Sequence, residues 1–426
     1  MIRVGVFPAG TEIGLEINNA LKYVKDIELV GITSAKDHSA FVYKRLVTNA
    51  PFLGEDGLID FLAKAVIKEK IDYIFPSGDE ASMVLSENEE KLGATVVMAG
   101  VEASRICCFK SLTFEALEGI DFLPDIYSSK ELSKINYPVF IKPDRGQGSV
   151  GAKRIENEKE LTTIANLNEY IICEYLPGKE FTVDCISNQN TRVMFVGMRQ
   201  RERIKSGISV ASSNIPLPDR VKDFAQQIAS RLKLMGAWFF QLKEDGAGKL
   251  KLMEVATRIA GTMGMYRNKG INFPLISLCI ARGFDIDLVD NRFDLAVDRA
   301  LVSRYATSLE YKKVYIDLDD TLILGKEINA EMMRFLYQCQ NKRVDLILIT
   351  RHVSDVEKTL NTFKIHLGLF KKIIHLQSND KKSEFMDSNS SIFIDDSFGE
   401  RLEVSSKLGI PVFDLDSIEL LIDWKR

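Results

Sequence analysis

Acidic side chains gather at the end of an apolar stretch late in the sequence, in YIDLDDTLIL at residues 315–324. Two later apolar runs also end in polar groups that can contact a phosphate. The polar residues at the three run ends are Asp317, Asp319, Thr321, Thr350, Asp395 and Asp396. A carboxylate can attack phosphorus, and neighbouring carboxylates can bind a divalent cation. The pattern therefore predicts a phosphate-handling site, provided that the fold brings the three run ends together.

A different phosphate-binding pattern occurs earlier, in YPVFIKPDRGQGSVG at residues 137–151. Lys142 ends an apolar run, and a loop of small residues follows it. The small residues are Gly146, Gly148, Ser149 and Gly151. A lysine ammonium can neutralise phosphates, and glycine lets backbone N–H groups approach the remaining oxygens. The stretch predicts a nucleotide-phosphate site, with a mobile hairpin as the structural alternative.

Polar residues that could complete this site follow on strand-like runs. They are Glu174, Tyr175, Leu176, Glu180, Gln241, Glu254 and Arg258. Magnesium prefers oxygen ligands, so Gln241 and Glu254 together with phosphate oxygens could hold it. Positioning and charge neutralisation carry most of phosphoryl transfer, which suits an arginine such as Arg258. Structural alternatives are a core hydrogen bond for Gln241, a surface lysine partner for Glu174 and an ordinary strand-edge position for Glu180.

Arginines alternate in the stretch MRQRERIKSG at residues 198–207. Alternate residues of a strand point to the same face, so Arg199, Arg201 and Arg203 could share one side of a sheet. Guanidinium groups bind carboxylates and phosphates well. We therefore predict that Arg199 and Arg201 contact an anionic substrate, with a solvated strand face as the alternative.

Three stretches of different texture must position these residues. Residues 1–105 and 308–426 alternate short β-rich runs with helical patterns, which is typical of parallel sheets with crossover helices. Residues 106–307 contain several strand-like runs and an amphipathic helical pattern, which indicate an α+β unit of antiparallel strands. We predict an α/β protein of three domains with these boundaries. The glycines of the first turn, Gly10 and Gly14, favour tight packing over a dinucleotide site because GxGxxG is not formed.

The composition excludes several classes of protein. The 426 residues carry a net charge of −4, which gives no basic footprint for nucleic acid. No apolar run reaches about 18 residues, the length that a membrane helix needs. The six cysteines and four histidines are scattered, so neither a disulfide framework nor a zinc site is expected. The start MIRVGVFPAG indicates a strand and not a signal peptide, and we expect a cytoplasmic protein.

Up to about Tyr305, the chain resembles the ATP-grasp superfamily, in particular its carboxylate–amine ligase and carbamoyl-phosphate-synthetase-like branch. The resemblance implies a Rossmann-like pre-ATP-grasp domain followed by the ATP-grasp domain. It assigns Lys110 and Lys142 to the ATP phosphates, residues 174–176 to the adenine hinge and Glu180 to the ribose. Gln241 and Glu254 would hold magnesium, and Arg258 would steady the transferring phosphoryl group. The sequence departs from the family's pattern in having Ala256 in place of asparagine and Phe109 in place of aspartate.

From about Lys312 onward, the chain resembles the haloacid dehalogenase-like superfamily in its capless form. The resemblance makes Asp317 a nucleophile that forms an aspartyl-phosphate, and Asp319 a general acid and base that adds to the acidic metal-binding cluster. Thr350 and Lys382 would hold phosphate oxygens, with Lys381 as an alternative to Lys382. Asp395 and Asp317 would bind magnesium with support from Asp396.

Together these resemblances predict a bifunctional enzyme. The first part would use ATP and Mg²⁺ (or Mn²⁺) to activate a carboxylate as an acyl phosphate for attack by an amine-type nucleophile. The last part would hydrolyse a phosphoester. The alternatives are an ATP-grasp kinase opposed by its own phosphatase, and a nucleotide-binding scaffold in which only the phosphatase is active. The expected partners are small molecules, without nucleic acid or membrane, and a homodimer is an alternative to a monomer.

Overall fold

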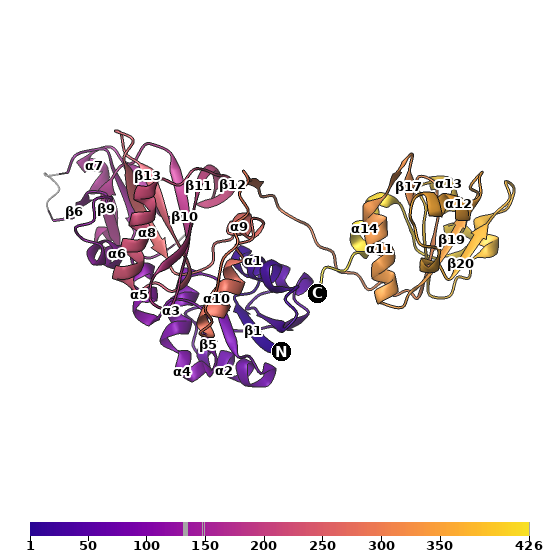
Figure 1. Cartoon of the computed structure of the whole chain (residues 1–426), viewed down its shortest axis with the longest axis horizontal. Helices are drawn as coiled ribbons and strands as arrows, with labels where there is room; N and C mark the ends of the chain where they lie inside the picture. The colour runs from indigo at the N-terminus through magenta and orange to yellow at the C-terminus, as the bar shows by residue number, and fades with distance from the viewer. Residues whose placement is uncertain (131–134, 147, 149, 426) are drawn as a thin grey trace. The chain divides into compact units, whose positions relative to one another are not determined.

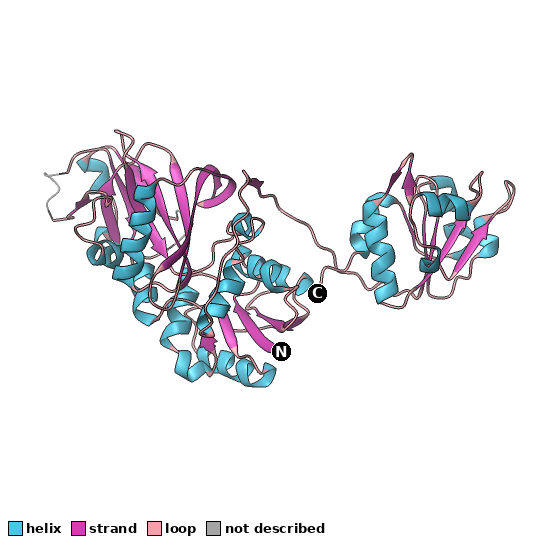
Figure 2. Ribbon diagram, viewed as in Figure 1, coloured by secondary structure: helices cyan, strands magenta, loops and turns pink. Residues whose placement is uncertain are grey.

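The computed structural model describes residues 1–130, 135–146, 148 and 150–425 (Figure 1, Figure 2). The chain divides into two compact units, built from Met1–Leu301 and from Val302–Trp424. This division falls between residues 301 and 302, whereas the sequence predicted the last boundary between residues 307 and 308. Among the described helices, none combines the length and the apolar composition that crossing a membrane requires.

The N-terminal part of the first unit is a parallel sheet of five strands, as the alternating pattern predicted. In spatial order the strands are β3 (Arg45–Val47), β2 (Ile27–Ile32), β1 (Ile2–Phe7), β4 (Tyr73–Pro76) and β5 (Thr95–Val96). Both faces are covered: α1 (Glu12–Leu21) belongs to one apolar core, and α2 (Leu58–Glu69) with α3 (Asp79–Glu87) to another. The short strand β3 carries no clear apolar alternation and was not expected.

The turn between β1 and α1 is closed by close packing. A Cβ atom on Gly10 would lie 2.0 Å from the carboxylate of Asp37, and one on Gly14 would lie 2.5 Å from the carbonyl oxygen of Ala9. Asp37 is held there by hydrogen bonds from Thr33 and Ser39. Both glycines are therefore explained by packing, which confirms the preference for that interpretation over a dinucleotide site.

Two antiparallel sheets make up the rest of the first unit. The smaller one runs β6 (Ile126–Tyr127), β9 (Tyr170–Glu174), β7 (Val139–Pro143) and β8 (Lys153–Ile155). The larger one runs β14 (Leu250–Ala256), β13 (Gly236–Glu244), β10 (Glu180–Ser187), β11 (Val193–Lys205), β12 (Ile208–Asn214) and β15 (Ala296–Asp298). Antiparallel pairing throughout matches the α+β texture that the sequence predicted for this region.

The larger sheet has one apolar and one polar face. On β10, Phe181 and Val183 belong to the same core as Val221 and Phe224 of α8 (Asp219–Leu232), so this helix covers one face. Because successive strand residues point to opposite faces, the intervening side chains of β10 and β13 point away from α8. The residues of these two strands on that opposite face include Glu180, Thr182, Asp184 and Gln241. The alternation of the sequence thus places the polar candidates on one surface.

The second unit is an open parallel sheet with helices on both faces (Figure 2). In spatial order its strands are β20 (Lys372–His375), β19 (Asp345–Thr350), β16 (Lys313–Ile316), β21 (Ser391–Ile394) and β22 (Val412–Phe413). Helices α11 (Ala330–Asn341), α12 (Val356–Thr362) and α14 (Ile418–Leu421) share one core, and α13 (Phe398–Leu408) belongs to the other. The three strands that end in phosphate-competent groups are neighbours in this order.

Trp424 joins the two ends of the second unit. Its ring lies 3.7 Å from the guanidinium carbon of Arg304 and 3.8 Å from that of Arg334. Arg304 precedes the first strand of the unit, and Arg334 lies on α11. Cations over an indole ring are attracted by its quadrupole, so this stack fastens the start of the unit to its end.

We expect Trp424→Ala to lower the free energy of unfolding of the second unit by about 2 kcal/mol, because it removes two cation–π contacts and buried ring area. Hydrogen exchange of the full chain, read by mass spectrometry on peptides from α11 and β16, measures this unit separately. Tyr337→Ala is the matched control, since Tyr337 is an exposed aromatic residue of α11. Equal protection of these peptides in both variants would show that the stack does not stabilise the unit.

Candidate functional sites

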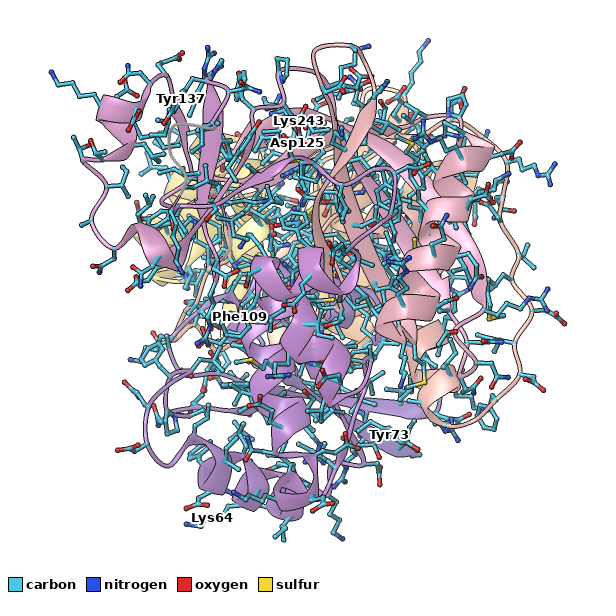
Figure 3. The ribbon with its side chains drawn as sticks, turned by 90° about the vertical axis from the view of Figure 1, so that its left-hand side faces the viewer. Lys64, Tyr73, Phe109, Asp125, Tyr137 and Lys243 are labelled. Atoms are coloured by element: carbon cyan, nitrogen blue, oxygen red, sulfur yellow. The ribbon has the colours of Figure 1, made fainter. Side chains whose placement is uncertain are left out.

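A small apolar cavity of about 60 Å³ lies where the smaller sheet meets β14. Its walls include Phe140, Cys173, Leu252 and Met253 together with the predicted hinge residues Glu174, Tyr175 and Leu176. Lys243 also lines it, and Lys243 and Asp125 mark this region in Figure 3. The backbone N–H of Asp125 donates to Glu174 Oε2 over 3.3 Å, and Lys251 Nζ lies 3.8 Å from the same carboxylate. The apolar walls and the polar rim are of the kind that a flat heterocycle needs.

The two predicted phosphate lysines line one larger cavity of about 220 Å³. Lys142 Nζ donates to the carbonyl oxygen of Met253 over 2.6 Å and lies 5.1 Å from the ring centre of Phe114. Burial lowers the pKa of Lys142. Lys110, at the start of α6 (Lys110–Ala116), donates to the carbonyl oxygen of Gly146 over 3.0 Å. The other predicted residues in the walls are Gly146, Gly148, Glu180, Arg201, Gln241 and Glu254, while Ser149 falls outside the described residues.

A β-bulge on β14 turns Glu254 toward this cavity. Gln241 pairs with Glu254 and Leu242 pairs with Leu252, so Met253 is the extra residue. Without the bulge, Glu254 and the core residue Leu252 would point to the same face. With it, Leu252 packs in the core while Glu254 lies opposite Gln241 on the polar face. The bulge also leaves the carbonyl of Met253 to accept the Lys142 hydrogen bond.

A second cavity, of about 250 Å³, adjoins the first. The two cavities share Gly148, Arg201, Gly207, Gln241 and Glu254. The second cavity extends to Thr11 and Glu12 at the start of α1 and to Ser77, which follows β4. Arg199 and Arg258 also line it. Arg258 pairs with Asp79 over 2.6 Å. Within the described part of the chain, Arg199 Nη1, Arg201 Nε and Arg258 Nε are buried N–H groups without a hydrogen-bond partner.

The arginines of β11 differ from the expectation in two respects. Arg199 is 2% exposed and pairs with the fully buried Asp184 over 2.7 Å, and Arg201 contacts Glu180 and donates to Gln241 Oε1 over 2.8 Å. Both side chains therefore already have acidic or amide partners. Arg203 does not share their face, because Glu202 is an extra residue at a register shift between Arg201 and Arg203. Arg203 pairs with Asp298 instead.

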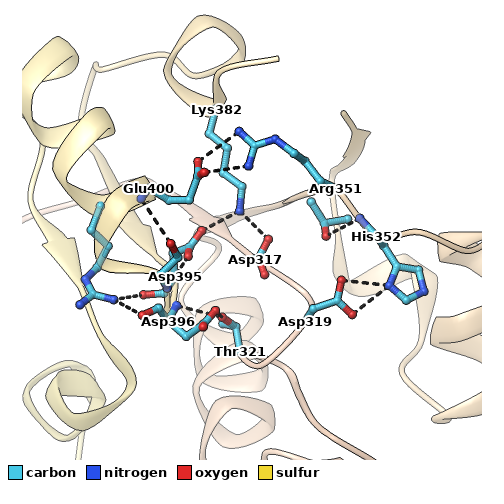
Figure 4. Close-up of polar contacts among 12 residues, drawn as sticks. Asp317, Asp319, Thr321, Arg351, His352, Lys382, Asp395, Asp396 and Glu400 are labelled. Carbon is cyan, nitrogen blue, oxygen red and sulfur yellow. Dashed lines mark hydrogen bonds and ion pairs between the residues drawn. The ribbon is translucent and has the colours of Figure 1, made fainter. Parts of the chain in front are cut away.

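In the second unit, a buried lysine joins the ends of neighbouring strands (Figure 4). Lys382 Nζ lies 2.5 Å from Asp317 Oδ1 and 2.6 Å from Asp395 Oδ2, and its side chain is 3% exposed. Lys381, which the sequence could not separate from it, is exposed at the start of the same turn. Thr321 Oγ1 lies 3.3 Å from Asp396 Oδ1. The predicted convergence of β16 and β21 at one sheet edge is thus present in the structure.

Burial governs the electrostatics of this cluster. It raises the pKa of Asp317 to about 7, against the lowering effect of Lys382. Burial likewise raises the pKa of Asp395. For Lys382, burial acts to lower the pKa, but the two carboxylates outweigh it and the pKa is raised. The lysine is therefore held in its charged form between the acids.

The described residues contain no group of three or more His, Cys, Asp or Glu side chains arranged to hold a metal ion. The predicted magnesium residues therefore form pairs: Gln241 with Glu254, and Asp317 with Asp395. Asp319 lies apart from the second pair and contacts His352. Both pairs offer oxygen donors alone, and Asp317 and Asp395 already hold a cationic ammonium between them, so the chemistry of the donors fits Mg²⁺.

Several residues of these sites were missed in the sequence. Asp79 and Asp184 pair with the candidate arginines, and His352 contacts Asp319. Asp184 lies opposite Gly197 of β11, two residues before Arg199. Only the register of β10 and β11 could have identified Asp184 as the partner of Arg199. His352 follows Thr350 by two residues, and this closeness to a predicted strand end was the one available signal.

Comparison with known proteins finds two family matches, and both lie within the first unit. Residues 166–300 match the family described as ATP-grasp in the biosynthetic pathway with Ter operon, and residues 112–207 match the C-terminal part of D-Ala–D-Ala ligase. The chain is 24% identical to the arginine-specific carbamoyl phosphate synthase large chain of Bacillus subtilis over 378 residues. That alignment covers 81% of this chain and only 36% of the relative.

Solved structures give the same fold. The biotin carboxylase domain of Hydrogenobacter thermophilus 2-oxoglutarate carboxylase superposes with a TM-score of 0.57 at 16% identity, covering 68% of this chain and 71% of that chain. The L-amino acid ligase of Bacillus licheniformis gives 0.55 at 17% identity, covering 66% and 74%. The mixed α/β architecture of the first unit is therefore ATP-grasp-like. Together with the sequence matches at residues 112–300, this makes the first unit similar to ATP-grasp proteins in sequence and in fold.

Proposed function

We propose that the first unit is an ATP-dependent ligase that activates a carboxylate as an acyl phosphate for attack by an amine-type nucleophile. The observation that carries the proposal is the continuity of two cavities. One is lined by Lys110, Lys142, Gln241 and Glu254, and the next is lined by buried arginines. The lysines of the first cavity can bind the phosphates of a nucleoside triphosphate, and the arginines of the second can bind an anionic acceptor beside it.

Each residue has a distinct role in this proposal. The apolar cavity beside residues 174–176 receives the adenine, and Glu180 lies where a ribose would reach. Lys110 and Lys142 neutralise the phosphates, and Gln241 with Glu254 would hold Mg²⁺, which neutralises the phosphate charge when bound. Arg258 is oriented by Asp79 and stabilises charge on the phosphoryl group as it passes to the carboxylate. Arg199 has a partnerless N–H group available to the acceptor.

The proposed reaction proceeds in two steps. A carboxylate oxygen of the substrate attacks the γ-phosphorus, and the bond to the β-phosphate bridging oxygen breaks to leave ADP. The amine then attacks the acyl carbon, the carbon–oxygen bond to phosphate breaks, and the amine loses a proton. The products are an amide, ADP and inorganic phosphate.

A screen of carboxylates and amines for ADP release, with mass detection of the products, tests this reaction. A ligase yields a new amide, and sustained ADP release requires both substrates because the amine must consume the acyl phosphate before the next turnover. ADP formed together with a phosphorylated product, and without an amide, would instead establish an ATP-grasp kinase. Nucleotide binding without turnover on the whole panel would support a scaffold.

We expect Glu254→Ala to reduce ADP release by about a hundredfold or more, and Gln241→Ala to reduce it less, because a carboxylate neutralises cation charge and an amide does not. Glu90→Ala, which changes an exposed glutamate of the same unit, is the control. With Ala256 in place of a ligand asparagine, Mg²⁺ binding without nucleotide should be weak. Calorimetric titration that assigns two tight Mg²⁺ ions to the first unit of the nucleotide-free protein would contradict this.

We further propose that the second unit is a phosphatase of the haloacid dehalogenase-like type. The supporting observation is the buried Lys382 between Asp317 and Asp395 at the ends of β16 and β21. Lys382 and Thr350 would bind the phosphate oxygens, and Asp317 with Asp395 would hold Mg²⁺, which screens the phosphate charge when bound. Release of inorganic phosphate from p-nitrophenyl phosphate by the full chain, lost on addition of EDTA, tests this activity.

A further inference from the structure

His352 occupies a fixed position beside Asp319. Its ring Nδ1 lies 2.9 Å and 3.0 Å from the two carboxylate oxygens of Asp319 (Figure 4), and its Nε2 lies 2.8 Å from Thr359 Oγ1 on α12. The His352 side chain is 16% exposed, whereas that of Asp319 is 50% exposed. A well-buried ring thus faces a carboxylate that would otherwise turn freely in solvent.

The backbone of His352 is fixed as well. Its N–H donates to Thr350 Oγ1 over 3.1 Å, and His375 Nε2 lies 2.6 Å from its carbonyl oxygen. These contacts tie His352 to the ends of β19 and β20, while Thr359 holds the ring from α12. The ring therefore has little freedom to follow Asp319, so the position of Asp319 follows the ring.

The hydrogen-bond chemistry defines the tautomer. An ionised carboxylate only accepts hydrogen bonds, so the Nδ1 atom that faces it carries the hydrogen. In a neutral ring Nε2 then accepts a hydrogen bond, and the hydroxyl of Thr359 can donate one. The carboxylate of Asp319 thereby selects the tautomer, and the hydroxyl of Thr359, which can donate or accept, completes it by donating to Nε2 and fixes the orientation of the ring.

We propose that His352 is the positioning residue of Asp319 in the phosphatase reaction, and that Thr359 holds the ring of His352 in place. The inference rests on the proposed phosphatase function of the second unit. It gives the half-exposed carboxyl group of Asp319 a hydrogen-bond partner that is itself held in place.

The orientation matters in both halves of the reaction. In the first, a carboxylate oxygen of Asp317 attacks phosphorus, the phosphoester bond breaks, and protonated Asp319 gives its proton to the leaving oxygen. In the second, a water oxygen attacks the aspartyl-phosphate, its proton passes to Asp319, and the phosphorus–oxygen bond to Asp317 breaks. The products are the alcohol and inorganic phosphate, and both aspartates return to their starting forms. A general acid is effective only when it lies within hydrogen-bond reach of the leaving oxygen.

The test compares phosphoesters whose leaving groups differ in basicity, using the full chain with Mg²⁺. The value of kcat/KM reports the steps up to release of the alcohol. Nitrophenolate leaves readily without a proton, whereas an alkoxide needs one. We expect His352→Ala to lower kcat/KM by about threefold or less on p-nitrophenyl phosphate and by roughly ten- to a hundredfold on an alkyl phosphate. The second loss is larger because general acid catalysis is worth about 10²–10⁴-fold.

Three further variants keep the test decisive. Thr359→Val should shift the leaving-group dependence in the same direction by a smaller factor, and it perturbs packing less than His352→Ala. In an Asp319→Asn background, His352→Ala should have no further effect on the alkyl phosphate. His366→Ala, a histidine of the same unit that caps a short turn, should leave both substrates unchanged.

The outcomes separate the inference from the function on which it rests. Equal losses on both substrates in His352→Ala, or additive losses in the Asp319→Asn background, overturn the positioning role alone. A wild-type protein without activity on any phosphoester overturns the proposed phosphatase and the inference with it.

Discussion

Lys142→Met should reduce ATP-dependent turnover by about a hundredfold or more while the fold of the first unit is kept. The ammonium of Lys142 reaches the cavity that we assign to the phosphates, and burial that lowers its pKa strengthens its attraction for an anion. Methionine has an unbranched side chain like lysine but removes the charge and with it the cation–π contact with Phe114. ADP release and nucleotide affinity are the measurements.

Lys142 also has a structural contact, so the experiment needs a control for stability. Its Nζ donates to the Met253 carbonyl, and methionine leaves that acceptor unpaired. Lys153→Met, which removes an exposed lysine from the neighbouring strand β8, should change neither ADP release nor nucleotide affinity. A lower melting temperature of Lys142→Met with unchanged nucleotide affinity would show that the lysine serves the fold and not the phosphates.

Asp317→Asn should reduce phosphate release from p-nitrophenyl phosphate by roughly a thousandfold or more, because a carboxamide is a poor nucleophile. The fold should persist, since asparagine has nearly the same shape and burial already disfavours the charge of Asp317. Lys382 keeps Asp395 as its partner. Steady-state phosphate release and hydrogen exchange of the second unit measure the two effects.

The same variant tests whether the two units act independently. Lys142 and Asp317 belong to separately packed cores, so ADP release by the first unit should persist in Asp317→Asn. The matched control is Asp387→Asn, an exposed aspartate of the second unit that contacts Lys313. Full phosphatase activity in Asp317→Asn would remove this residue from the nucleophile role.

Periodic features of the sequence were the reliable guide to the fold. The parallel sheets follow from β-rich runs alternating with amphipathic helices, and the neighbouring positions of β16, β19 and β21 follow from the rule that parallel strand ends share an edge. The polar face of the larger antiparallel sheet follows from the period of two. Strand β3 was missed because a three-residue run, RLV, carries too little alternation to be recognised.

Irregularities of register limited what could be predicted of the sites. Strict alternation placed Arg203 on the face of Arg199 and Arg201, but the extra residue Glu202 reverses its side. The bulge at Met253 similarly decides that Glu254 faces the cavity. Neither bulge contains a glycine or a proline from which it could have been predicted. Contacts between distant segments, such as Arg258 with Asp79, depend on tertiary packing and leave no trace in local spacing.

The common wall of the two cavities in the first unit has a thermodynamic consequence. Arg201, Gln241 and Glu254 belong to both cavities, and Arg201 bridges Glu180 and Gln241. A ligand that shifts these side chains in one cavity changes the free energy of binding in the other. Linkage requires that coupling to be reciprocal: the factor by which a nucleotide changes the affinity for the acceptor equals the factor by which the acceptor changes the affinity for the nucleotide. We therefore expect the nucleotide and the acceptor to bind with a coupling free energy that two binding titrations can each measure.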